Sequence, residues 1–106
     1  MANCIRAAIF YDGGSPYGFN ISGHAGSAPK GHNLACAAVS VLVRTVSRYL
    51  INLNLVTQYE LLANEVKLMA RKENDKVITA LQILEQGLND IALEYPKLIK
   101  LDKVGE

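Results

Sequence analysis

The chain has few of the residues that bind metals or form disulfide scaffolds. Its 106 residues include no tryptophan, two cysteines and two histidines. No CxxC or HxxxH pair occurs, so the usual ligand spacing of a structural zinc site is missing. A lone pair of cysteines, Cys4 and Cys36, is seldom a structural disulfide in a reducing compartment. We expect no metal and no cofactor.

An excess of charge of one sign is also missing. Lys and Arg number 11 against 10 Asp and Glu, which gives a formal charge of +1, and no long basic run occurs. Proteins that bind nucleic acid mainly through its phosphates usually have a basic patch or stripe on their surface. We therefore expect no direct nucleic-acid partner.

Neither a secretion signal nor a membrane span is indicated. Residues 1–6 lack a basic segment followed by an apolar segment and a small-residue cleavage site. The longest apolar stretch, Leu34 to Val43, is broken by Ser40 and ended by Arg44, well short of a span. The sequence predicts a cytoplasmic protein with no membrane partner.

The composition that is present favours one folded domain over residues 1–106. Half of the residues are hydrophobic and a fifth are charged, which is ordinary for a globular protein and too apolar for disorder. The length leaves room for one core and little for a second.

The first third of the chain predicts a β-hairpin, a loop and a helix. Strand-like runs at Ile5 to Tyr11 and Phe19 to Ser22 are separated by the turn signals of residues 12–16. Residues 23–33 hold three glycines and no periodicity, which is typical of a loop. A helix is expected from Leu34 to about Leu53, with Asn33 as its N-cap. The residues on its apolar side are Val39, Leu42, Val46, Leu50 and Leu53.

The rest of the chain predicts a second β-pair and a second helix. Residues 56–71 are ambiguous between helix and strand, and a β-pair is favoured. Asn74 or Asp75 caps a helix that Pro96 stops, and Leu98 to Leu101 is a closing strand or a tail. Its apolar stripe contains Val77, Leu81, Leu84, Leu88, Ile91 and Tyr95. The order β-β-α-β-β-α, with two helices packed on a mostly antiparallel sheet, is an α+β fold.

Cys36 is the strongest candidate for a catalytic nucleophile. An early helix cysteine is most often a buried small hydrophobe. On the expected helix, however, Cys36 points roughly 100° from the core direction, on the stripe of Ser40 and Ser47 and beside Arg44. A first-turn position would also place helix amides and the helix dipole near a thiolate or an oxyanion. These observations favour a nucleophile with an acidic thiol.

A thiol nucleophile benefits from an imidazole that accepts its proton and returns it to the leaving amine. His24 ends the second predicted strand, and the loop can bring it back to the helix start. His32 is closer in sequence but precedes the cap. Position alone does not choose between the two histidines.

Two segments resemble a known family. Gly23-His24-Ala25 and the run from Gly31 to Ser40, GHNLACAAVS, are similar to the signature of the bacterial ribosomal-processing cysteine proteases called Prp. The end of the chain, Glu94-Tyr95-Pro96 followed by Ile99-Lys100-Leu101, is also similar to that family.

The resemblance implies a function and a catalytic pair. It implies that Cys36 and His24 form a Cys-His dyad that removes the N-terminal extension of the twenty-seventh protein of the large ribosomal subunit. It also implies a homodimer with a mobile loop over the site. Many members have Asp where this chain has Asn33, a change that affects rate more than reaction type. The alternative is a non-catalytic ribosome-assembly or peptide-binding module.

Other residues are predicted to have roles in substrate binding, in folding or in dimer formation. We expect residues 25–30 to form a lid over the site, because their small side chains have little to bury. Cys4 is interpreted as structural and Asp12 as a turn former. Ala38, Val41 and Tyr49 add apolar surface to the first helix, which favours a homodimer. The substrate-binding or lid residues are predicted to be Gly23, Ala25, Gly26, Ser27, Gly31, Asn33 and Ser40.

Overall fold

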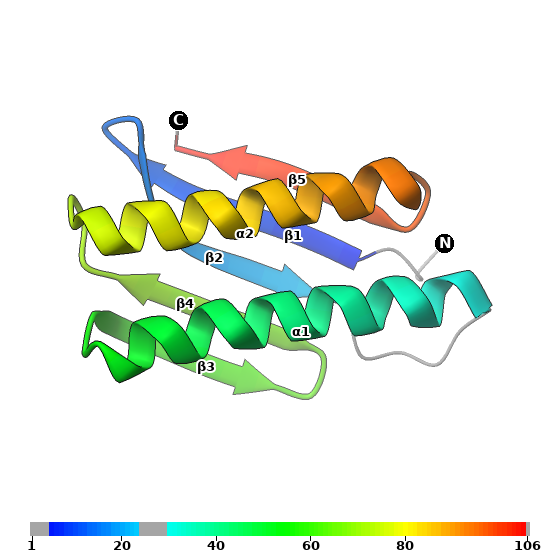
Figure 1. Ribbon diagram of the computed structural model, residues 1–106, viewed down its shortest axis with the longest axis horizontal. Helices are drawn as coiled ribbons and strands as arrows, with labels where there is room; N and C mark the ends of the chain where they lie inside the picture. The colour runs from blue at the N-terminus through cyan, green and yellow to red at the C-terminus, as the bar shows by residue number, and fades with distance from the viewer. Residues whose placement is uncertain (1–4, 24–29, 106) are drawn as a thin grey trace.

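The computed structural model describes the backbone of residues 5–23 and 30–105, and the side chains of all of these except residues 30–33. Figure 1 shows the α+β fold that the sequence predicted, with one strand added after the second helix. The elements are β1 (Ile5–Asp12), β2 (Ser15–Ser22), α1 (Lys30–Asn52), β3 (Val56–Leu62), β4 (Glu65–Ala70), α2 (Asp75–Glu94) and β5 (Ile99–Val104).

The five strands form one sheet in the order β3-β4-β2-β1-β5. Three of the four neighbouring pairs are antiparallel, and β5 runs parallel to β1. A parallel pair needs a long connection, which α2 provides by carrying the chain back along the sheet. The ambiguous residues 56–71 are therefore a β-hairpin, and the closing segment at the end of the chain is a strand.

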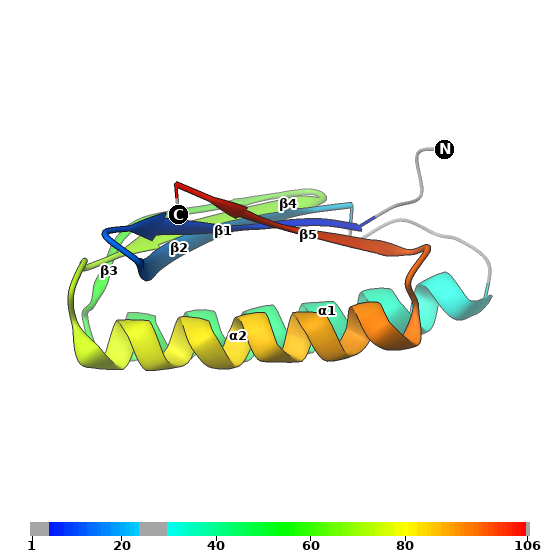
Figure 2. The same cartoon turned by 90° about the horizontal axis from the view of Figure 1, so that it is seen from above.

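Both helices cover the same face of the sheet, as Figure 2 shows. Side chains alternate along the strands, so that Ile5, Ala7 and Ile9 of β1 are buried under the helices while Arg6 is exposed. Phe19 and Ile21 of β2 are buried on the same side. This two-layer arrangement places the hydrophobic core between the sheet and the helix pair.

The first hairpin is longer than the sequence predicted. Gly13 and Gly14 have φ values of 62° and 85°, which is the left-handed region required by a two-residue hairpin turn. Because these two glycines make the whole turn, β2 begins at Ser15 and not at Phe19. Pro16 is tolerated within the strand near its start.

The start of α1 differs from the prediction. The helix begins at Lys30, so Gly31, His32 and Asn33 lie within it, and the assignment of Asn33 as the N-cap was wrong. A glycine in a helix costs only about 1 kcal/mol, and the long apolar stretch that follows outweighs this cost. Cys36 is consequently in the second helical turn and not in the first.

The buried face of α1 is rotated relative to the predicted face. Val43 and Ser47 are buried, whereas Leu42 is half-buried and Leu53 is exposed. The helix packs against both the sheet and α2, and a Cβ built on Gly87 of α2 would lie 2.5 Å from Leu42 Cδ2. Leu42 therefore packs against α2, and the neighbouring Val43 faces the sheet.

The second helix follows the prediction closely. Asn74 is its N-cap, and the Asn74 Oδ1 atom accepts hydrogen bonds from the amides of Lys76 at 2.9 Å and Val77 at 3.2 Å. The predicted stripe is buried at Val77, Leu81, Leu84 and Leu88. Ile91 and Tyr95 are partly buried against the same core.

By length and composition alone, Leu34–Asn52 of α1 could cross a membrane, with a mean hydropathy of 1.6. The sequence divided this segment at Arg44, whereas the helix continues through it. The residues of its inner face, including Val39 and Leu50, are fully buried in the core of this domain. A helix that packs one face on a sheet is typical of the core of a globular domain.

Candidate active site

Cys36 lies on the inner face of α1, in the second turn of the helix. The residue is 7% exposed and belongs to the same core cluster as Ala35 and Val39. The prediction that Cys36 faces polar surroundings was therefore wrong. Leu42 is half-buried and Leu53 is exposed, so the inner face of α1 is rotated toward Cys36 and away from the predicted apolar side.

The end of β2 is a polar neighbour of the thiol. The Cys36 Sγ atom donates to the carbonyl oxygen of Gly23 across 3.9 Å, which is a long contact for a weak donor. Gly23 has a φ of 82°, and its amide donates to the carbonyl oxygen of Asn64 at 2.9 Å. The thiol, the end of β2 and the turn between β3 and β4 therefore meet at one place.

This geometry changes how the thiol can be activated. The field of a helix dipole falls off within the first turn, and Cys36 lies beyond it. An unpaired charge is costly to bury, so a thiolate at this position requires a cationic partner nearby. The segment that follows Gly23 begins with His24, which is a candidate for that partner.

Half of the other predicted site residues lie in parts of the chain that the structure does not describe. These are His24, Ala25, Gly26 and Ser27. Cys4, which was interpreted as structural, also lies outside the described residues. Gly31 and Asn33 are described by their backbone alone, within α1. Among the described side chains, Gly23 and Ser40 are the two predicted site residues that can be placed relative to Cys36.

Ser40 is half-buried and follows Cys36 by one helical turn. It borders a cavity of about 160 Å³ between α1 and the β3–β4 hairpin, which we name the hairpin cavity. Sequence reasoning missed this cavity because its walls come from segments that are distant in the chain. Its lining residues are Ser40, Val43, Arg44, Ser47, Tyr59, Leu61 and Val66.

Asp12 lies at the opposite end of the first hairpin from the thiol. It pairs with Ser15 across the turn, whereas Ser22, next to Gly23, pairs with Arg6 at the other end. The Asp12 carboxylate is 2.8 Å from Lys72 Nζ, and this contact raises the pKa of Lys72 above its ordinary value. This position agrees with the interpretation of Asp12 as a turn residue.

Within residues 5–23 and 34–105, no three His, Cys, Asp or Glu side chains gather in a way that could hold a metal ion. In this small α+β domain the helix residue Cys36 contacts Gly23, which directly precedes His24 in the sequence. This arrangement makes the protein a candidate thiol enzyme. The family comparison names the class: the chain belongs to the cysteine protease Prp family, whose profile matches residues 4–100.

Solved structures share this fold. The crystal structure of SMU.848 from Streptococcus mutans superposes with a TM-score of 0.83 at 22% identity, covering 98% of this chain and 97% of that chain. The essential ribosomal processing protease Prp from S. aureus, in complex with a substrate peptide, gives a TM-score of 0.84 at 21% identity. That match covers 93% of this chain and 98% of the S. aureus chain. No curated protein matches the sequence.

Proposed function

We propose that this protein is a cysteine endopeptidase of the cytoplasm that removes the N-terminal extension of a large-subunit ribosomal protein, the twenty-seventh. Cys36 is the nucleophile and His24 is its base. Membership of the cysteine protease Prp family supports the reaction class. The S. aureus protein with the same fold has been crystallised with a substrate peptide and with a covalently linked product peptide, which supports a peptide substrate.

The contact between Cys36 and Gly23 is the observation that carries the dyad. The Cys36 Sγ atom lies 3.9 Å from the carbonyl oxygen of Gly23, and the next residue in the chain is His24. Chain connectivity therefore ties His24 to the neighbourhood of the thiol. His32 precedes Cys36 by four residues on α1, which is one helical turn, so its spacing does not exclude it. The resemblance of Gly23-His24-Ala25 to the family signature is the reason for choosing His24.

The proposed reaction has two steps. The His24 imidazole accepts the thiol proton, and the Cys36 sulfur attacks the scissile carbonyl carbon and forms a C–S bond. Collapse of the tetrahedral intermediate breaks the C–N bond, and the imidazolium gives its proton to the leaving amine. A water molecule, deprotonated by His24, then attacks the thioester and releases the carboxylate product and the free thiol.

The direct test uses the unprocessed ribosomal protein of the same organism as substrate. We expect incubation with this protein to give two products whose masses, measured by mass spectrometry, add up to the substrate plus one water. A peptide-based electrophile should add one equivalent of mass at Cys36. Cys4→Ser is the matched control and should keep both activities.

Two outcomes would contradict the proposal. An intact substrate after incubation at several temperatures and salt concentrations would exclude cleavage of this protein. Binding of the extension peptide without cleavage or labelling would support the rival function, a non-catalytic ribosome-assembly or peptide-binding module.

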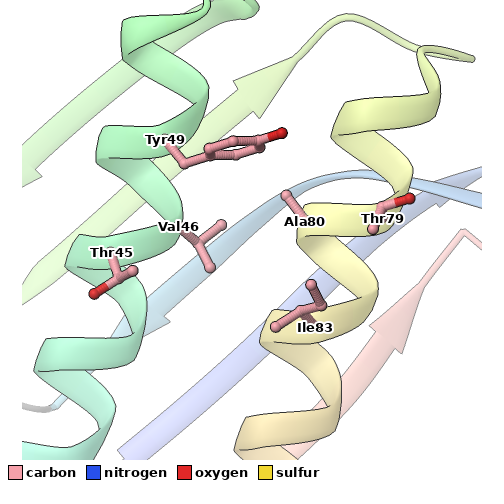
Figure 3. Close-up of a pocket in the computed structure, with 6 residues that line it drawn as sticks. All are labelled: Thr45, Val46, Tyr49, Thr79, Ala80 and Ile83. Carbon is pink, nitrogen blue, oxygen red and sulfur yellow. The ribbon is translucent and has the colours of Figure 1, made fainter.

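The outer face of the helix pair supports a homodimer as part of the same proposal. An apolar groove of about 250 Å³ lies between α1 and α2. Figure 3 shows its lining residues, with the Tyr49 ring reaching toward α2. Ile83, which lines this groove, is 58% exposed, and Val41 on α1 is 57% exposed. Exposed apolar area of this kind is typical of an interface, and a second copy would cover it through a two-fold axis. The groove residues are Thr45, Val46, Tyr49, Thr79, Ala80 and Ile83.

A further inference from the structure

The hairpin cavity adjoins the thiol along α1. Ser40 follows Cys36 by four residues, which places it on the same side of the helix about 6 Å farther along the axis. Ser47 follows by eleven residues, about 16 Å along the axis. The α1 wall of the cavity therefore begins one turn from the sulfur and runs away from it.

The hairpin wall begins at the same place. Leu61 pairs with Val66 beside the turn between β3 and β4. In that turn, the carbonyl oxygen of Asn64 accepts the hydrogen bond from the amide of Gly23. Figure 1 shows α1 running alongside this hairpin, so the cavity lies between them as a continuation of the candidate active site.

The spacing defines which substrate residue reaches the cavity. An extended peptide advances about 3.3 Å per residue. Consider an extended peptide with its scissile carbonyl at Cys36 and its backbone running along α1. The residue that lies over the cavity would then be two to four positions from the cleaved bond.

The lining selects an uncharged apolar side chain. Val43 and Val66 are buried walls, and Leu61 adds an exposed apolar edge. The lining contains one charge, that of Arg44, whose exposed side chain would repel a cationic occupant. An ionised side chain would also lose its water without gaining a buried partner. The volume of about 160 Å³ is similar to that of apolar cavities of roughly 150 Å³ that hold a benzene molecule.

Ser47 provides an independent observation. It is 2% exposed, and its Oγ atom has no hydrogen-bond partner among the atoms that the structure describes. An unpaired buried hydroxyl disfavours folding, so packing alone does not account for serine between Val43 and Leu50 on this face. A small side chain at this position keeps the cavity open, because a leucine would extend into it.

We propose that the hairpin cavity is a specificity pocket that binds one large apolar or aromatic side chain of the extension peptide, two to four residues from the cleaved bond. The proposal rests on the proposed protease function and adds the chemistry by which the enzyme recognises its substrate. Ser47 keeps the pocket open, and Leu61 and Val66 line it on the hairpin side.

The test combines an alanine scan of the extension peptide with a variant that fills the cavity. The scan should identify one large apolar residue of the peptide, two to four positions from the cleaved bond. Replacing this residue by alanine should lower the kcat/KM of the unmodified enzyme about tenfold to a hundredfold. Ser47→Leu should lower kcat/KM for the parent peptide by a similar factor. It should cleave the alanine peptide as fast as the unmodified enzyme does. Gln82→Leu, an exposed change of α2, is the control and should keep the full discrimination.

The proposal would be overturned if Ser47→Leu kept the same ratio of kcat/KM between the parent peptide and the alanine peptide as the unmodified enzyme. If Ser47→Leu does not fold, Leu61→Ala, which changes an exposed wall residue, should reduce the discrimination, and unchanged discrimination again overturns it. Peptide binding to Cys36→Ala, measured by fluorescence anisotropy, separates the pocket from catalysis. Weaker binding of the alanine peptide supports the pocket even if no cleavage occurs, and equal binding of both peptides contradicts it.

Discussion

Cys36 contributes to packing as well as to the proposed chemistry. It is buried in the core cluster, so truncation removes a sulfur that contacts the surrounding side chains. We expect Cys36→Ala to abolish cleavage and to lower the free energy of unfolding by about 1 kcal/mol, at the low end for a small cavity. Urea denaturation followed by circular dichroism measures the second effect. Residual cleavage by this variant would exclude Cys36 as the nucleophile.

Cys36→Ser separates the two contributions of the thiol. It preserves the approximate shape of the side chain and replaces the thiol by a hydroxyl. This variant should keep the fold and still be inactive, because a neutral hydroxyl is a poor nucleophile beside a single base. Circular dichroism and the cleavage assay measure the two effects.

The two histidines provide a test of the proposed base. We expect His24→Ala to lower kcat about a hundredfold to ten-thousandfold, the usual contribution of a positioned proton-transfer group. His32→Ala should change kcat much less, because the resemblance of Gly23-His24-Ala25 to the family signature assigns the base to His24. Single-turnover cleavage of the extension peptide measures both. Equal and small effects would remove His24 from the proposed dyad.

The start of α2 is an element whose stability depends on one side chain. Asn74 Oδ1 accepts two amide hydrogen bonds of the first turn. Asn74→Ala should lower the free energy of unfolding by about 1 kcal/mol. Asn89→Ala, an exposed change within the same helix, is the matched control and should be neutral or slightly stabilising, since alanine is the better helix former. Equal losses in both variants would show that the cap contributes nothing.

The two helices differ in how far their periodicity predicted their packing. α2 has one apolar stripe, which the structure confirms, and of the two predicted cap candidates the structure selects Asn74 over Asp75. α1 is apolar on several sides, with exposed Val41, half-buried Leu42 and buried Val43 in succession. When three adjacent positions are all apolar, periodicity alone does not choose the inner face. Contact with Gly87 of α2 and with the sheet makes that choice.

The whole molecule exposes an apolar helix layer that a monomer leaves in water. We expect light scattering to give the mass of a dimer, and Tyr49→Glu together with Ile83→Glu to give a monomer, because buried unpaired carboxylates disfavour association. Gln82→Glu, on an exposed position of α2, is the control and should remain a dimer. A monomer at high concentration in the unmodified protein would contradict the proposal.

The sequence by itself determined the α+β class, the first hairpin and the second helix. It favoured the second hairpin and narrowed the helix cap to Asn74 or Asp75 without deciding either. These features depend on local signals: paired glycines, alternating strand residues and an apolar stripe with a polar N-cap. The Gly-His-Ala and helix cysteine motifs also indicated the family, which the match over residues 4–100 confirmed. Cys36 and Gly23 were among the residues that the sequence selected, and the structure brings them into contact.

Only the tertiary structure decided the parts that depend on contacts between distant segments. The parallel pairing of β5 with β1 follows from the path of α2 over the sheet. The burial of Cys36 depends on which face of α1 meets the sheet, and several of its faces are apolar enough to do so. The hairpin cavity exists because α1 and the β3–β4 hairpin lie side by side. Local sequence sets which conformations are favoured, but packing in three dimensions selects among faces that are nearly equal in hydrophobicity.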